Sequence, residues 1–70
     1  MTIRLNGDPY ELAGPMSVTA LLSALDIDPR RVAVELNLTV LKRAAFPTTM
    51  IQAGDTMEIV NFVGGGSRSA

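Results

Sequence analysis

The chain has 70 residues, 47% of them hydrophobic and 19% charged, which is enough apolar material for one small domain and too little length for two. Six basic and seven acidic residues give a net charge of −1, which excludes a strong positive field for nucleic acid. The absence of cysteine and histidine excludes disulfides, thiol nucleophiles and soft-metal sites. No hydrophobic run approaches the roughly 20 residues of a membrane span, so we expect a cytoplasmic protein without membrane contact.

Residues 2–6 and 10–12 alternate apolar and polar side chains, which predicts two strands with Ile3 and Leu5 on one face. Between them lies a cluster of turn-forming residues, Asn6-Gly7-Asp8-Pro9. Asn-Gly favours a tight hairpin because both residues tolerate positive φ angles. The sequence therefore begins with a β-hairpin, which ends before Gly14-Pro15.

The period changes to that of a helix from residue 17 onward. The apolar residues Val18, Leu21, Leu22 and Leu25 share one helical face. Ser17 is placed to cap the N-terminus, and Met16 to contact Leu21 across the first turn. Because a residue before proline is disfavoured in the α region, we expect the helix to end at Asp28-Pro29.

Residues 31–37 and 39–41 predict two further strands, joined by a short turn at Asn37-Leu38. Residues 42–55 lack a clear period, apart from one helical turn at residues 43–46 before Pro47. Ala53-Gly54-Asp55 is a turn signal. The four methionines are expected to fill the core; they are Met1, Met16, Met50 and Met57.

The last predicted strand, residues 56–63, carries apolar side chains on both faces. If Met57 and Ile59 face the helix, Val60 and Phe62 point to the opposite side. We expect these two exposed side chains to form part of a partner surface, with Gly64 beside it. Lys42 and Arg43 would add charge complementarity to an acidic partner. The alternative is a second small core beneath residues 42–55.

The predicted order is thus β-β-α-β-β-β, one helix covering a sheet, which belongs to the α+β class. We expect a single domain over residues 1–63. Residues 64–70 contain no side chain suited to a core and are expected to form a flexible glycine-rich tail.

The sequence contains no catalytic constellation and no metal site, because its carboxylates are scattered over turns and outward strand positions. The run Gly64-Gly65-Gly66 has three interpretations. A linker is the simplest, and a phosphate-binding loop fails because no lysine or helix follows the glycines. The third is that bare backbone threads a slot too narrow for side chains and presents a terminal carboxylate as a reactant.

Several stretches together resemble the thiamine-biosynthesis sulfur carriers, a ubiquitin-like β-grasp family related to the small subunit of molybdopterin synthase. The stretches are residues 3–7, 17–22, 32–37, Lys42-Arg43, 53–55 and 58–66, ending in Val63-Gly64-Gly65-Gly66. Their order and spacing agree with the elements predicted above. The resemblance implies a β-grasp fold with a mixed sheet of four to five strands packed on one helix.

The resemblance also implies that the chain is a substrate and not an enzyme. The carboxylate of Gly66, following Gly65, would be adenylated by an E1-like activating enzyme that uses ATP, while the chain itself binds no cofactor. Sulfur would then replace AMP as a thiocarboxylate, which would pass to thiazole synthase. Two alternatives remain: a sulfur carrier for another pathway (molybdopterin, cysteine or a secondary metabolite), and a β-grasp interaction module without chemistry.

The sequence departs from the family after Gly66, because Ser67-Arg68-Ser69-Ala70 follows the glycine that should be terminal. Either a peptidase removes Ser67 to Ala70, or these residues are an addition to the natural chain, or this copy is not a working carrier. An exposed tail would offer no obstacle to cleavage.

Overall fold

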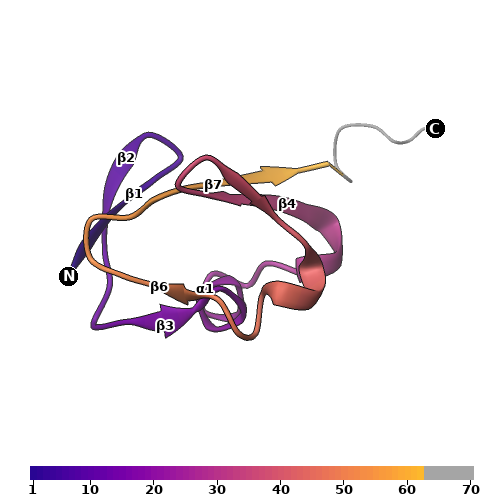
Figure 1. Ribbon diagram of the computed structural model, residues 1–70, viewed down its shortest axis with the longest axis horizontal. Helices are drawn as coiled ribbons and strands as arrows, with labels where there is room; N and C mark the ends of the chain where they lie inside the picture. Colours follow the sequence, from indigo (N-terminus) through magenta and orange to yellow (C-terminus); the bar gives the residue numbers. More distant parts are fainter. Residues whose placement is uncertain (63–70) are drawn as a thin grey trace.

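The computed structural model describes residues 1–62, so the expected tail and the three glycines lie outside the described residues. Two layers make up the fold (Figure 1): the main sheet lies on one side, and α1 (Val18–Ala24) lies on the other beside a small two-stranded sheet. The main sheet contains β1 (Thr2–Leu5), β2 (Asp8–Glu11), β4 (Val32–Leu36), β5 (Thr39–Leu41) and β7 (Thr56–Asn61). Within residues 1–62, the structure contains no helix with the length and hydropathy of a membrane-spanning segment.

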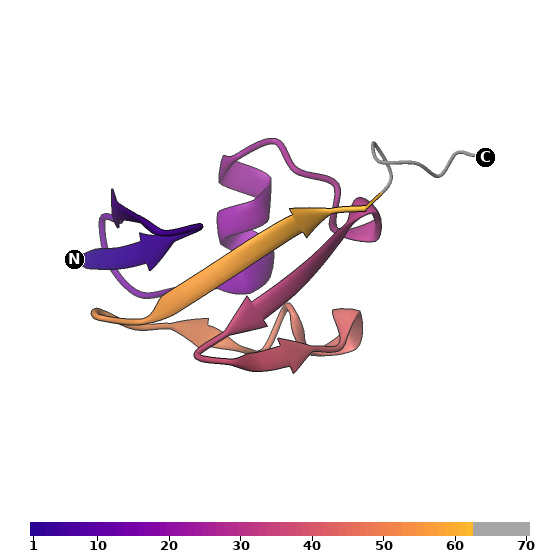
Figure 2. The ribbon, with the colours of Figure 1, turned by 90° about the horizontal axis from the view of Figure 1, so that it is seen from above.

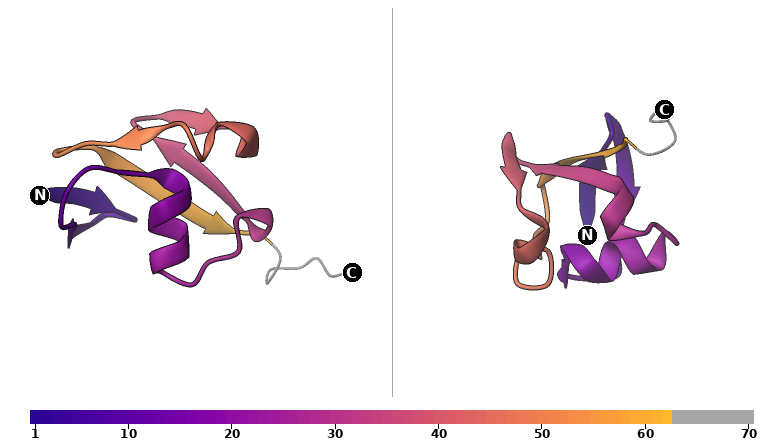
Figure 3. Two further views of the ribbon diagram at one scale, coloured as in Figure 1. Left: turned by 90° about the horizontal axis from the view of Figure 1, so that it is seen from below. Right: turned by 90° about the vertical axis from the view of Figure 1, so that its right-hand side faces the viewer.

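The strand order of the main sheet is β2-β1-β7-β4-β5, so the last strand in the sequence occupies the centre. β1 and β7 run parallel, and the other neighbours run antiparallel. Figure 2 looks onto the outer face of this sheet with α1 behind β7, and Figure 3 shows the same helix from below. The predicted α+β fold, with a mixed sheet of five strands on one helix, is confirmed.

The first hairpin forms where the sequence predicts it, with a tighter turn. Asn6 and Gly7 both have positive φ, 50° and 88°, as a two-residue turn requires. β2 begins directly afterwards, so Asp8 and Pro9 are strand residues and the expectation that they belong to the turn is wrong. Proline is tolerated here because β2 is at the edge of the sheet, where its missing N–H breaks no ladder.

α1 begins as expected. The Ser17 hydroxyl oxygen accepts a hydrogen bond from the backbone N–H of Ala20 at 3.0 Å, which satisfies one of the free donors of the first turn. The buried side chains of the helix are Val18, Leu21 and Leu22. Burying each leucine contributes on the order of 1.5–3 kcal/mol, which orients the short helix against the sheet.

The expected end of the helix at Asp28-Pro29 is wrong, because α1 ends at Ala24 with Leu25 as its C-cap. Asp26 adopts a left-handed conformation, with φ of 60°. The N–H of Asp26 then donates to the Ser23 carbonyl, and the N–H of Ile27 donates to the Leu22 carbonyl. This pair of bonds is a Schellman motif, in which aspartate takes the position usually held by glycine.

Two short strands were not predicted: β3 (Met16–Ser17) pairs antiparallel with β6 (Met50–Ile51). The pairing leaves Met50 47% exposed, so its expected place in the core is wrong, whereas Met57 is fully buried. Two single 3₁₀ turns complete the described chain, η1 (Pro29–Arg31) and η2 (Arg43–Ala45). The second of these confirms the helical turn expected before Pro47.

The core lies between the main sheet and α1, and most of it comes from the predicted faces. Its buried members are Ile3, Leu12, Val18, Leu21, Leu22, Val32, Val34, Leu36, Phe46, Ile51 and Met57. Leu5, Leu25 and Ile59 pack against this cluster and are only partly buried. β4 contributes three of the buried side chains, and its neighbour β7, the last strand of the described chain, contributes Met57.

Candidate functional site

β7 carries the chain to the edge of the described structure and is held on both sides. It pairs with β4 over five positions, from Leu36 opposite Met57 to Val32 opposite Asn61. Beyond the strand, the N–H of Phe62 donates to the carbonyl of Arg31 at 3.1 Å. The backbone is thus fixed up to Phe62, four residues before Gly66.

Two asparagine side chains add to this support. The Ile59 N–H donates to Asn6 Oδ1 at 2.8 Å, and Asn6 Nδ2 donates to the Ile59 carbonyl at 3.3 Å. At the other side of β7, the Thr56 N–H donates to Asn37 Oδ1 at 2.9 Å, and Asn37 Nδ2 donates to Asp55 at 3.0 Å. Both asparagines have positive φ and belong to hairpin turns. The turns therefore serve to position β7 as well as to reverse the chain.

The outer face of the sheet, opposite α1, carries the apolar side chains expected there. Val60 is 57% exposed and Phe62 is 53% exposed, so they do not cover a second core beneath residues 42–55. Val60 lies opposite Ala33 in β4, and Val40 of β5 adds a further exposed apolar side chain on this face. We name Ala33, Val40, Val60 and Phe62 the outer-face patch. Its position beside the end of β7 suits a surface that a partner covers while holding the tail.

Two carboxylates face each other within this surface. Glu35 of β4 lies directly opposite Glu58 of β7, and Glu35 also lies opposite Val40 of β5. Neither carboxylate has an ion-pair partner within residues 1–62. Like charges at directly opposed positions destabilise a strand pair. A basic side chain supplied by a partner would relieve this repulsion.

The structure places Lys42 and Arg43 after β5, at the start of η2, with both side chains exposed. Leu41, the last residue of β5, lies opposite Val34, and Lys42 directly follows it as the N-cap of η2. Lys42 is therefore at the end of the strand that carries Val40 of the outer-face patch. Arg43 lies one residue farther along the 3₁₀ turn, and neither residue has an ion pair within residues 1–62.

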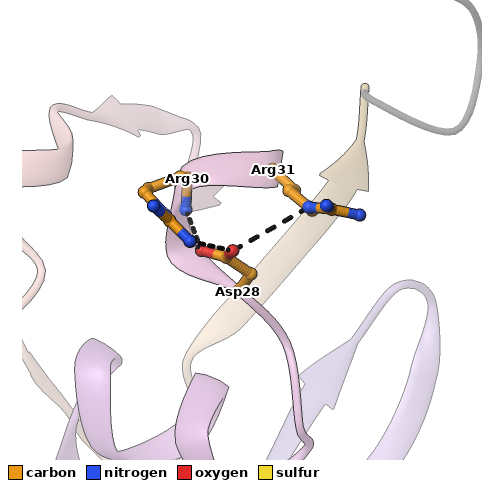
Figure 4. Close-up of polar contacts among 3 residues, drawn as sticks. All are labelled: Asp28, Arg30 and Arg31. Carbon is orange, nitrogen blue, oxygen red and sulfur yellow. Dashed lines mark hydrogen bonds and ion pairs between the residues drawn. The ribbon is translucent and has the colours of Figure 1, made fainter.

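A cationic group that the sequence analysis did not single out lies where β7 ends (Figure 4). Arg30 binds Asp28 through two contacts, Nε to Oδ1 at 3.1 Å and Nη2 to Oδ2 at 2.8 Å. Arg31 Nε lies 3.8 Å from the same Oδ2. The hydrogen bonds from Arg30 lower the pKa of Asp28 to about 2, and this carboxylate in turn raises the pKa of Arg30. The only sequence signal was the motif Asp-Pro-Arg-Arg, in which Asp28 caps η1.

The proposed reactive residues Gly65 and Gly66, together with Gly64, lie outside the described residues. Within residues 1–62, no group of three or more potential metal-ligating side chains comes together. A hollow of about 300 Å³ lies over the start of β1 and β7, lined by Thr2, Ile3, Arg4, Pro9, Gly54 and Thr56. It is at the opposite end of β7 from Phe62, so it is not part of the surface described above.

Comparison with known proteins agrees with this architecture. The ThiS family model matches residues 3–66. The crystal structure of the thiamine biosynthesis protein (ThiS) from Geobacter metallireducens is 43% identical, covers 94% of this chain and 100% of its own, and superposes with a TM-score of 0.82. This similarity confirms the β-grasp fold.

Two curated relatives differ greatly in length. An uncharacterized protein, ycf40, of Porphyra purpurea is 39% identical over 66 residues, covering 94% of this chain and 93% of its own. A thiazole synthase of Paramagnetospirillum magneticum is 40% identical over all 70 residues, and there the chain spans only 22% of the relative. The match of the family model over nearly the whole sequence is decisive, and the chain belongs to the ThiS family, the sulfur carriers of thiamine biosynthesis.

Proposed function

We propose that this chain carries sulfur as a thiocarboxylate on the carboxylate of Gly66. The observation that supports this most directly is the placement of β7. This strand is central in the sheet and is hydrogen-bonded on both sides. It leads to Phe62, which belongs to an exposed apolar patch and precedes Gly66 by four residues in the sequence. Such an arrangement suits a protein that docks by a rigid face and extends its chain end into a partner.

The proposed chemistry needs an activating enzyme, since a carboxylate is anionic and its oxygen is a poor leaving group. The Gly66 carboxylate attacks the α-phosphorus of ATP and releases pyrophosphate, which gives an acyl adenylate. A persulfide sulfur of the transfer machinery then attacks the acyl carbon and AMP leaves. A second thiol cleaves the resulting sulfur–sulfur bond, which leaves the thiocarboxylate on the carrier and a disulfide on the machinery.

The proposed partners are an E1-like adenylating enzyme, which uses the ATP, and thiazole synthase, which accepts the sulfur. The second partner is supported by the similarity of this chain to 22% of a longer relative that is named thiazole synthase. The chain itself acts as a co-substrate and binds no cofactor. We place the reaction in the cytoplasm, where ATP is available to the activating enzyme.

The proposed reaction also requires a peptidase that exposes the carboxylate of Gly66. In the sequence, Ser67 follows Gly66, so the carbonyl of Gly66 is part of a peptide bond. Cleavage between Gly66 and Ser67 must therefore precede adenylation. A narrow channel in the activating enzyme would explain why the residues before the reactive carbon are glycines, since they lack Cβ atoms.

The decisive experiment compares two forms of the protein in ATP–pyrophosphate exchange with the adenylating enzyme of the same organism. The form ending at Gly66 should support exchange, and the form ending at Ala70 should not. A matched variant, Gly66→Val in the trimmed form, should lose most of the activity because its branched side chain cannot enter the channel. Exchange by the longer form with Ala70 still present, verified by mass spectrometry, would contradict the role assigned to Gly66.

A further inference from the structure

The backbone of β7 leaves the sheet directly beside Arg31. The N–H of Phe62 donates to the Arg31 carbonyl at 3.1 Å, and Val32 lies opposite Asn61 in the preceding ladder position. Figure 4 shows Arg31 next to the end of β7. A partner that receives residues beyond Phe62 therefore comes close to η1, which carries the Arg31 side chain.

The two arginines of η1 differ in how much of their hydrogen-bonding capacity is used. Arg30 contacts both oxygens of Asp28, at 3.1 and 2.8 Å. Arg31 has one ion-pair contact, from Nε to Asp28 at 3.8 Å, and its two terminal nitrogens have no partner within residues 1–62. A guanidinium carries five N–H donors in a planar fork that matches a carboxylate. Arg31 thus contacts Asp28 through Nε alone, which leaves the two terminal nitrogens of its guanidinium available to a further partner.

The local charge is positive although the whole chain is slightly acidic. One carboxylate, Asp28, is shared between two guanidiniums, which leaves a net charge of about +1 at this corner. Asp28 stays ionised at any physiological pH, because hydrogen bonds from Arg30 hold its pKa at about 2. The carboxylate that Arg31 contacts therefore keeps its charge over the pH range in which a cell operates.

We propose that Arg31 forms a bidentate ion pair with a carboxylate of the adenylating partner, at the mouth of the channel that takes the tail. The inference rests on the proposed function and adds the contact that aligns the carrier with that channel. A carboxylate fits better than a nucleotide phosphate, because four extended residues from Phe62 to Gly66 span about 13 Å. The phosphates at the reactive end would be beyond the reach of the Arg31 side chain.

From this geometry we expect the loss of Arg31 to weaken binding more than the loss of an ordinary exposed charge would. Exposed ion pairs contribute little in free solution, but an ion pair that is desolvated at an interface is costly to break. We expect Arg31→Ala to weaken binding of the trimmed carrier to the adenylating enzyme at least tenfold at about 0.1 M salt. Arg31 is 62% exposed, so the melting temperature should stay close to that of the unchanged protein.

The test is calorimetric titration of the enzyme with the chain ending at Gly66, which keeps every residue that the structure describes. Arg4→Gln is the matched control: it removes the same charge from the outer face at the other end of β7, where Arg4 lies opposite Thr56. We expect this control to change the dissociation constant less than threefold. Equal losses of affinity in Arg31→Ala and Arg4→Gln would overturn the proposal, because the loss would then follow from the change in net charge alone.

A second measurement identifies the group that Arg31 contacts. Arg31→Lys should become covalently linked to the enzyme by a carbodiimide, which joins an amine to an adjacent carboxylate, and mass spectrometry should locate an acidic residue of the enzyme. If the carrier becomes cross-linked to the enzyme only through other amino groups and never through position 31, the inference is contradicted. If the unchanged carrier does not bind the enzyme at all, the proposed function fails instead, so the two failures are distinguishable.

Discussion

The side-chain amide of Asn6 forms hydrogen bonds with the backbone of Ile59, as the backbone of a residue in a neighbouring strand would. The Ile59 N–H donates to Asn6 Oδ1 at 2.8 Å, and Asn6 Nδ2 donates to the Ile59 carbonyl at 3.3 Å. β1 ends at Leu5, so without this side chain the peptide groups of Ile59 would lose their neighbour on that side. The hairpin turn therefore extends the support of β7 toward the end from which the tail departs.

We predict that Asn6→Ala destabilises the fold by about 2 kcal/mol, because it removes both hydrogen bonds and leaves a side chain with a Cβ at positive φ. Asn6→Gly separates the two causes, since glycine accepts that φ without strain. The glycine variant should lose about 1 kcal/mol in urea titration. Unchanged stability in both variants would show that the amide contacts contribute nothing.

We predict that Leu22→Ala costs about 2 to 5 kcal/mol, because the leucine is only 1% exposed between α1 and the sheet. The matched control is Leu38→Ala, which deletes the same atoms from a side chain that is 88% exposed in the turn between β4 and β5. That control should stay within about 0.5 kcal/mol in denaturant titration. A loss below this value at Leu22 would mean that the buried face of the helix is assigned wrongly.

The sequence predicts those parts of the fold that are determined by residues close together in the chain. Alternation of apolar residues locates β1, β4 and β7, and the pairs Asn6-Gly7 and Asn37-Leu38 mark both hairpin turns with positive φ. Leu38 is notable because a branched side chain rarely adopts φ of 70°. The Asn37 side chain, bonded to Asp55 and Thr56, holds this turn in place.

What the sequence could not show depends on contacts between distant segments. β3 and β6 have two residues each, too short for a periodic pattern, and they pair residues 16–17 with residues 50–51. The helix end was missed because aspartate replaces glycine at the left-handed position of the Schellman motif. Pro29 does not end α1, which stops at Ala24; it is the first residue of η1.

The same distinction between local causes and contacts between distant segments applies to the candidate site. The exposure of Val60 and Phe62 follows from the phase of one strand, and is confirmed. Their role as a partner surface, like that of Lys42, Arg43 and Gly64, stays a prediction. The sequence did not point to Arg31, because its place beside the end of β7 results from the antiparallel register of β4 and β7, which brings Val32 opposite Asn61.

We predict that acid destabilises the unchanged protein more than Asp28→Asn between about pH 4 and pH 2. The pKa of Asp28 is about 2 in the fold and near 3.8 ordinarily, so the unfolded chain binds this proton more readily. The stabilisation from ionised Asp28 is thus present above pH 4 and lost as the pH falls toward 2. Urea titrations at several pH values measure it.

The matched control for that prediction is Asp26→Asn. The Asp26 carboxylate has no hydrogen bond or ion pair within residues 1–62, and asparagine tolerates the left-handed conformation found there. This variant should keep the full acid sensitivity. An identical pH profile for Asp28→Asn and the unchanged protein would show that the contacts of Asp28 with Arg30 and Arg31 do not stabilise the fold.

Our last prediction concerns Phe62, the aromatic side chain nearest the tail. Phe62→Ser should weaken binding to the adenylating enzyme at least tenfold, because aromatic anchors contribute most at the centre of interfaces. The melting temperature should change little, since Phe62 is 53% exposed and outside the buried core. Leu38→Ser is the control, an exposed apolar side chain at the far end of the sheet. A large fall in melting temperature with unchanged binding would make Phe62 a packing residue of β7, and equal binding losses in both variants would show that the enzyme does not recognise the outer-face patch specifically.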